Sequence, residues 1–161
     1  MVWEILQPFV HLAGDSAFGQ WIGRSTDRIA WLFVVHLIGL TLLLGGTLVV
    51  SLRLLDIGLR AQPLRQLARD VAPWRTAGLL LSLLSGALIF TGGAVSYFEG
   101  VWFRRKMTLL VVALLFHATW FRSITQADEG RFSPWLNRAT GGLTLLLWFG
   151  VGAAGRAIAF F

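Results

Sequence analysis

The feature that most constrains this chain is a set of four long apolar segments separated by short charged ones. The first contains WLFVVHLIGLTLLLGG, residues 31–46, which is apolar throughout except for the imidazole of His36. A helix that crosses a bilayer needs about 20 consecutive, predominantly apolar residues. The four segments therefore predict membrane-spanning helices at about 29–52, 74–97, 103–124 and 139–161.

The composition indicates the same class of protein. Hydrophobic residues make up 56% of the 161 residues and charged residues 14%, whereas about a quarter of the residues in an ordinary soluble domain are charged. Because the four spans use most of the chain, we expect one membrane domain over residues 1–161, an all-α up-down four-helix bundle. The sequence has no cysteine, which excludes disulfides, thiolate metal sites and covalent c-type haem attachment.

The basic residues predict the orientation of the spans. Eight arginines fall in the loops after the first and third spans, and five basic residues fall on the other face. Short loops rich in Lys and Arg stay in the cytoplasm, so both termini are expected on the outer side of the membrane. Charge placed at span ends indicates membrane topology rather than nucleic-acid binding.

The first 25 residues are too polar to span a bilayer. In this segment Asp15 or Ser16 can cap a helix, and Phe18, Trp21 and Ile22 then recur at i, i+3 and i+4. Such a pattern is typical of an amphipathic helix that lies in the membrane interface. We therefore predict an interfacial segment over 1–25.

Small residues recur at helical spacing in three of the spans. These stripes include Gly39 and Gly46 in the first span, Gly78, Ser82 and Gly86 in the second, and Gly141, Gly152 and Gly155 in the fourth. Helices in lipid associate through close backbone packing, which small residues permit. The stripe of the first span includes His36, so its imidazole is expected to face the bundle interior.

Three ionisable residues of the spans are expected at membrane depth, away from the charged clusters at the span ends: His36, His117 and Arg156. An ionisable side chain at membrane depth is costly and usually faces the interior with a partner. His36 and Arg156 are expected at similar depth toward the outer face, and Thr91 can reach the same layer. Trp148, on the stripe of the fourth span, is the further candidate contact for a cofactor.

Two neutral imidazoles across a bundle can ligate the iron of haem b, which needs no cysteine. We predict His36 as an axial ligand, His117 as the second one, and Arg156 as the partner of a haem propionate or a quinone carbonyl. His117 is expected about 5–10 Å deeper than His36, so ligation by His36 alone is one alternative. A hydrogen bond from His36 to a carbonyl or a facing Ser or Thr, which needs no cofactor, is another.

Several motifs together resemble an uncharacterised bacterial family of small four-span inner-membrane proteins. They are VVHLIGLTLLLGG, SLRLLDIGLR, APWRTAG, FTGG, WFRRKMTLL and GRAIAF, and they cover residues 14–160 in this order. The resemblance implies a four-helix bundle in the bacterial inner membrane, with periplasmic termini under the orientation above, and no established activity. The architecture is more distantly similar to that of four-helix membrane cytochromes b.

Three functions remain open at this point. The chain is a haem b-binding electron-transfer subunit with a protein partner at the outer face, a non-catalytic accessory subunit of a larger membrane complex, or a binding protein for a quinone or another lipophilic ligand. No HExxH motif, readable nucleophile–base pair or paired carboxylates within a span occur. We therefore predict no catalytic residues, and expect an electron carrier or accessory subunit rather than a stand-alone enzyme.

Overall fold

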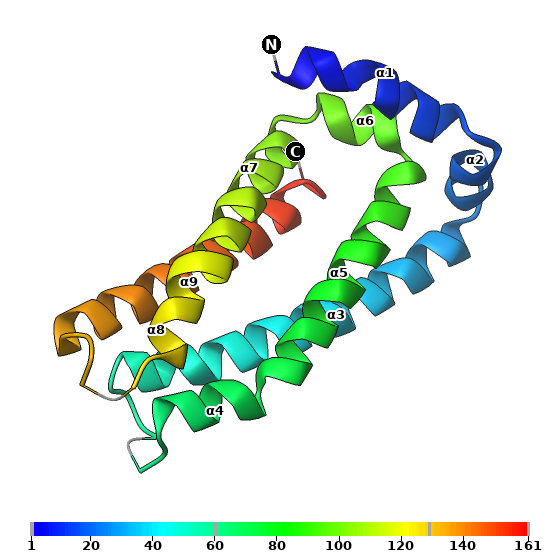
Figure 1. The fold of residues 1–161 in the computed structure, drawn as a ribbon. Coiled ribbons are helices and arrows are strands. Elements are labelled where there is room, and N and C mark those ends of the chain that lie inside the picture. Colours follow the sequence, from blue (N-terminus) through cyan, green and yellow to red (C-terminus); the bar gives the residue numbers. More distant parts are fainter. Residues whose placement is uncertain (1, 60, 129, 161) are drawn as a thin grey trace.

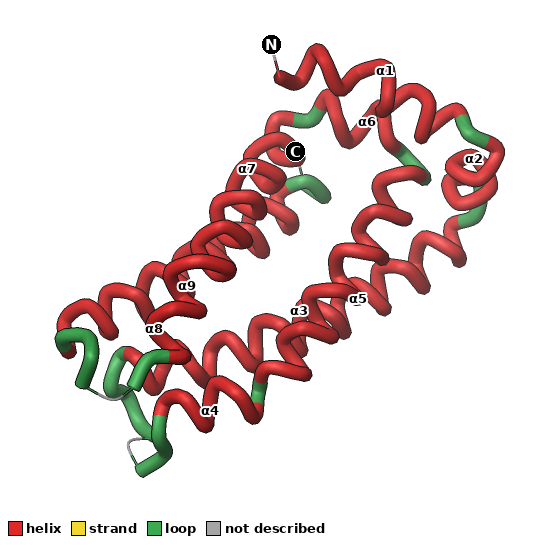
Figure 2. Tube along the Cα trace, in the orientation of Figure 1, coloured by secondary structure: helices red, strands yellow, loops and turns green. Residues whose placement is uncertain are grey.

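The computed structural model describes residues 2–59, 61–128 and 130–160, which form helices joined by short loops (Figure 2). The long helices are α3 (Thr26–Leu54), α5 (Ala72–Thr91), α7 (Val101–Phe116) and α9 (Pro134–Ala157). Helix α7 continues through a π-helical turn, η1 (His117–Phe121), into α8 (Arg122–Gln126). The shorter helices are α1 (Val2–Asp15), α2 (Ala17–Gly23), α4 (Leu64–Asp70) and α6 (Ala94–Glu99).

Successive long helices run in opposite directions (Figure 1). Helix α3 packs along α5 on one side and along α9 on the other, and α7 packs along α9. Helices α5 and α7 stand apart in the same view. The long helices are thus packed in the order α5, α3, α9, α7. Helices α5 and α7 are therefore the two outer members of this order.

Three helices in the described ranges are long and apolar enough to cross a membrane: Thr26–Leu54, Ala72–Thr91 and the continuous helix Val101–Gln126. Their outward faces carry large apolar side chains such as Leu37, Leu84 and Leu115, each about 60% exposed. Contiguous exposed apolar surface of this kind is rare on a soluble monomer. The apolar helices therefore indicate a lipid bilayer environment.

The fourth predicted span differs from the prediction. Helix α9 begins at Pro134 and ends at Ala157, rather than covering 139–161, and it is not among the three helices that meet the length and hydropathy criteria. Five glycines and two arginines, Arg138 and Arg156, lower its hydropathy. A bundle of four membrane spans is thus not established by the helices alone.

The second predicted span is also shorter than expected. Helix α5 ends at Thr91, and Gly92 and Gly93 separate it from α6. In Figure 1, α6 lies against α1 at the end of the molecule that also holds the N-terminus. Phe98 of α6 meets Trp3 of α1 edge to face, with ring centroids 5.6 Å apart. The chain thus changes direction at Gly92 and Gly93, and α6 packs against α1 of the N-terminal segment.

The N-terminal segment is two helices, α1 and α2, rather than one. Ser16 caps α2 as predicted, since its side chain accepts a hydrogen bond from the Gly19 amide. Phe18 and Trp21 are exposed and stack on each other, but Ile22 is buried and touches the position where Gly92 would carry a Cβ. The three residues therefore do not share one face, because Ile22 packs inward against the α5–α6 break.

Close contact between α3 and α5 is made by the predicted small residues. A Cβ added at Gly39 would lie 2.6 Å from Ser82 Oγ and 2.7 Å from the Ser82 amide nitrogen, and one added at Gly78 would lie 2.5 Å from the Leu43 nitrogen. Gly152, also predicted to lie in a packed stripe, has nothing within 4 Å. Only part of the small-residue stripe of α9 therefore packs against other helices of this chain.

We predict that Gly39→Ala destabilises the fold, because its new methyl group would meet the backbone of α5. Overpacking of this kind costs about 1–3 kcal/mol. Gly45→Ala is the matched control in the same helix, since nothing lies within 4 Å of its Cβ position. Thermal unfolding of both variants in one detergent provides the measurement. Equal melting temperatures would contradict close packing of α3 on α5.

Candidate functional site

His36 faces α5, as the small-residue stripe predicted. Its Nδ1 lies 3.0 Å from Ser85 Oγ, and Ser85 Oγ donates its own proton to the Leu81 carbonyl at 2.5 Å. Because a hydroxyl has one proton to donate, Ser85 must accept from His36. In the neutral imidazole this hydrogen bond places the proton on Nδ1 and leaves a lone pair on Nε2, the form of imidazole that binds a metal.

Lys106 of α7 shares the layer of His36. Its charge lies close enough to act on the imidazole, and its Nζ lies 3.4 Å from the Cβ position of Gly155 on α9. Within the described part of the chain, no carboxylate pairs with Lys106. The ring packs directly on Gly86 of α5, since a Cβ there would lie 3.1 Å from His36 Cε1. We call His36, Ser85, Gly86, Lys106 and Gly155 the His36 layer.

Arg156 and Thr91 make other contacts. Arg156 is exposed, and its guanidinium lies over the Phe160 ring, 4.1 Å from the ring centroid. Thr91 donates to the Leu88 carbonyl of its own helix at 2.8 Å. The cation that the structure brings to His36 is thus Lys106, whereas the sequence pattern indicated Arg156.

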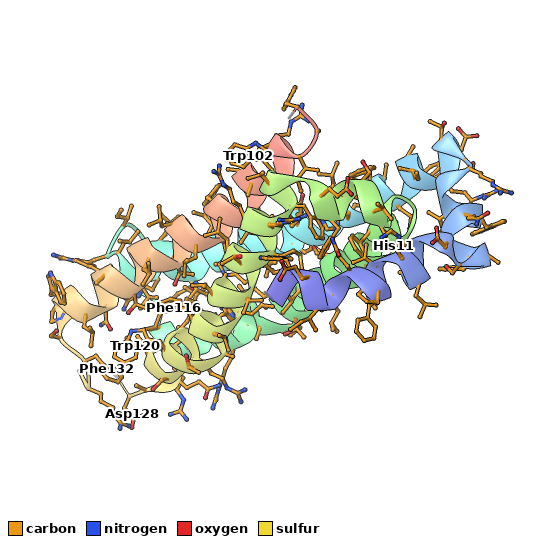
Figure 3. All side chains as sticks on the ribbon, turned by 90° about the horizontal axis from the view of Figure 1, so that it is seen from above. His11, Trp102, Phe116, Trp120, Asp128 and Phe132 are labelled. Atoms are coloured by element: carbon orange, nitrogen blue, oxygen red, sulfur yellow. The ribbon has the colours of Figure 1, made fainter. Side chains whose placement is uncertain are left out.

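His117 begins the π-helical turn, in a second layer. Its ring stacks on Phe121 with centroids 4.6 Å apart and meets Trp148 edge to face at 6.1 Å. Its Nδ1 is buried and has no hydrogen-bond partner. π-Helical turns occur frequently at functional sites because they displace a side chain from its regular helical position. The turn is tied to α9 by Trp120, labelled in Figure 3, whose Nε1 donates to Thr140 Oγ1 at 3.1 Å.

The two histidines do not share a layer. Leu43, which lines the same cavity as His117, follows His36 by seven residues, about 10 Å along α3. The ring of His117 also stacks on a residue further along its helix, in the direction away from the His36 layer. The arrangement therefore presents two separate imidazoles rather than a facing pair.

The cavity beside His117 has a volume of about 410 Å³ and is lined by residues of α3, α4, α5, η1, α8 and α9. Arg75 of α5 lines it, and its Nε and Nη1 atoms are buried without hydrogen-bond partners. The Arg75 guanidinium lies 5.2 Å from the centroid of Phe121. We call this space the Arg75 cavity. From the sequence we counted Arg75 among the arginines of the loop after the first span. The structure places it inside α5, two residues after Pro73.

The Arg75 cavity is strongly basic. Besides Arg75, its lining includes Arg65, Arg69 and Arg122, and no described Asp or Glu lines it. Arg65 pairs with Asp128, 3.0 Å away, at the exposed loop labelled in Figure 3. An exposed pair of this kind contributes little stability. His11, also labelled there, is an exposed residue of α1 outside both layers.

Fold and site together define an all-helical protein of a bilayer environment with two polar layers between its helices. It belongs to a family of unknown function, DUF6644, whose model matches residues 9–161. This agrees with the resemblance to an uncharacterised family. Comparison with curated proteins and with solved structures yields no match.

We predict that His36 carries its proton on Nδ1. Selective ¹⁵N labelling of histidine and NMR in detergent at neutral pH should give an unprotonated Nε2 resonance that His36→Gln removes. Ser85→Ala should change the Nδ1 shift, whereas Ser96→Ala, a serine of α6 outside the layer, should not. A protonated Nε2 in the wild-type protein would contradict the assigned hydrogen bonds.

Proposed function

We propose that this chain is a haem b-binding membrane protein that transfers electrons to a partner at its outer face, with His36 as the axial ligand. The observation that carries the proposal is the unprotonated Nε2 that the Ser85 hydrogen bond leaves on His36. A metal-ligating histidine usually donates its other ring N–H to an acceptor that orients it. Ser85 is such an acceptor.

The charge near His36 also matches that of haem b. A haem b carries propionates, and Lys106 is the cation in the layer that lacks a carboxylate partner among the described residues. An ammonium placed between apolar helices needs an anion close to it. We therefore assign to Lys106 the role that the sequence suggested for Arg156. When bound, haem b supplies one-electron transfer.

The proposed ligation uses His36 alone, because His117 lies in the other layer. His36 would hold the iron and Ser85 would fix the orientation of the ring. Gly86 and Gly155 would allow the imidazole and the Lys106 side chain to pack closely on α5 and α9. The apolar cluster of Leu43, Ala113, Trp148 and Val151 would separate this site from the Arg75 cavity and exclude water. Trp148, predicted from the sequence as a cofactor contact, lies in this cluster and meets the ring of His117.

We also propose that α9 is the fourth span of a bacterial inner-membrane protein with periplasmic termini. Leu146 and Phe149 of α9 are 70% and 53% exposed, as large apolar residues are on the other three long helices. The arginines of the α3–α5 and α8–α9 connections favour a cytoplasmic location for that end. The His36 layer would then lie toward the outer face.

We predict a reduced-minus-oxidised absorption spectrum typical of haem b for the purified protein. His36→Ala should abolish the Soret and α bands, because it removes the iron ligand. His117→Ala, the matched control, should retain both bands. Lys106→Met should retain the ligand but weaken haem retention at least several-fold during purification.

A protein without these bands under haem-sufficient expression would contradict the proposal. Bands that persist in His36→Ala and vanish in His117→Ala would place the iron in the other layer.

A non-catalytic accessory subunit is the second candidate. Gly45 of α3 and Gly152 of α9 both have nothing within 4 Å, so two helices keep small-residue surfaces that another helix could approach closely. Co-purification of a constant membrane partner with a chain that has no chromophore would favour this function over electron transfer. A quinone in the His36 layer would instead appear in the organic extract of the purified protein.

A further inference from the structure

We propose that the Arg75 cavity is a binding site for an anionic amphiphile. The carboxylate or phosphate oxygens of its head would be bound by Arg75, and its acyl chain would lie against Trp148, Leu43 and Leu79. This site is distinct from the one proposed at His36. Its polar groups, Arg75 and His117, are not those of the His36 layer, and it does not depend on the haem proposal.

The strongest support is the state of Arg75. Two of its nitrogens, Nε and Nη1, are buried, and neither has a hydrogen-bond partner. Arginine remains charged in proteins, and a buried polar or charged group without a partner is costly. The Phe121 ring at 5.2 Å offsets part of this cost through a cation–π contact, but it accepts no hydrogen bond in the plane of the guanidinium.

The chemistry of the missing partner follows from the guanidinium. The guanidinium offers two pairs of parallel donors, Nε with Nη2 and Nη1 with Nη2, and each buried nitrogen belongs to one of them; either pair matches the two oxygens of a carboxylate or phosphate. Since no described acidic residue lines the cavity, the chain supplies no such group there. The buried Nδ1 of His117, also without a partner, provides a second polar contact for the same head. A neutral quinone could accept a hydrogen bond from Arg75 but would leave its charge unneutralised.

The remaining lining indicates an amphiphile rather than a free anion. Leu43, Leu79, Phe121 and Trp148 form an apolar wall directly beside the polar groups. A volume of about 410 Å³ lies within the range of sites for small ligands, about 300–1,000 Å³. It exceeds what a carboxylate or phosphate group alone would fill.

A route from the bilayer to the cavity is also present. Thr76 of α5 and Ala118 of η1 both line the cavity and are exposed, so it opens sideways between these two elements. Arg69 and Arg122, exposed and also in the lining, add positive charge near the opening. An anionic head at the membrane surface would be attracted there.

The test measures binding of oleate to the full-length protein in a neutral detergent, with oleyl alcohol as the uncharged analogue of equal chain length. Oleate should bind at least ten times more tightly than oleyl alcohol. Arg75→Gln should weaken oleate binding at least tenfold, whereas Arg156→Gln, an exposed arginine outside the cavity, should leave it unchanged. Equal binding of oleate and oleyl alcohol, or of wild type and Arg75→Gln, would overturn the proposal.

Two further probes identify the head and the tail. Dioleoyl phosphatidate in nanodiscs should compete with oleate if a lipid phosphate is accepted, and failure to compete would restrict the class to carboxylates. Inorganic phosphate should not compete at millimolar concentration. Phosphate binding as tight as that of oleate would overturn the assignment of an amphiphile.

A fluorescence measurement keeps the test decisive if Arg75→Gln does not fold. Dibromostearate should quench the tryptophan emission of the wild-type protein, and Trp148→Phe should remove most of that quenching. Quenching unchanged in Trp148→Phe would overturn the location. His36→Ala, which tests the haem proposal, should still bind oleate, so failure of one proposal can be told from failure of the other.

Discussion

The close approach of α3 and α5 positions the two groups on which both proposals depend, His36 and Arg75. Gly39 and Gly78 let the two backbones approach until no side chain fits between them. Two consequences follow, one on each side of this contact. Toward the N-terminus of α3, His36 reaches Ser85. Toward its C-terminus, Gly46 leaves space for the side chain of Arg75, whose Cγ lies 2.6 Å from the Cβ position of Gly46. Helix packing in lipid thus determines where the ionisable side chains lie.

The two layers share a physical problem. Each contains a cation, Lys106 or Arg75, for which the described residues provide no carboxylate, and each contains an imidazole; that of His117 has a buried Nδ1 without a hydrogen-bond partner. Between apolar helices such charges are costly and usually functional. Ligands that bring their own negative charge resolve both cases. A propionate in one layer and the head of an amphiphile in the other are the groups whose chemistry fits.

The sequence predicted the helical class, the inward face of His36 and the hydroxyl alternative that Ser85 provides. It predicted these features because hydrophobic periodicity and the spacing of small residues are local properties of the chain. It did not identify Lys106 or Arg75 as site residues. Both lie near predicted span ends among other basic residues, so we interpreted them as charges that set the orientation of the spans. The π-helical turn at His117 has no signature in the sequence. The difference in depth between the two histidines was expected from the residue count along the helices, and the structure places the two rings in separate layers.

Native mass spectrometry of the wild-type protein, released from mild detergent after purification from its own membrane, tests the central claim most directly. That claim is that the buried cations are neutralised by ligands from outside the chain. The account predicts species heavier than the bare chain of 17.8 kDa, with bound masses that remain at low activation and leave at high activation as anions or as haem. A spectrum containing only the bare chain at every activation energy would contradict it.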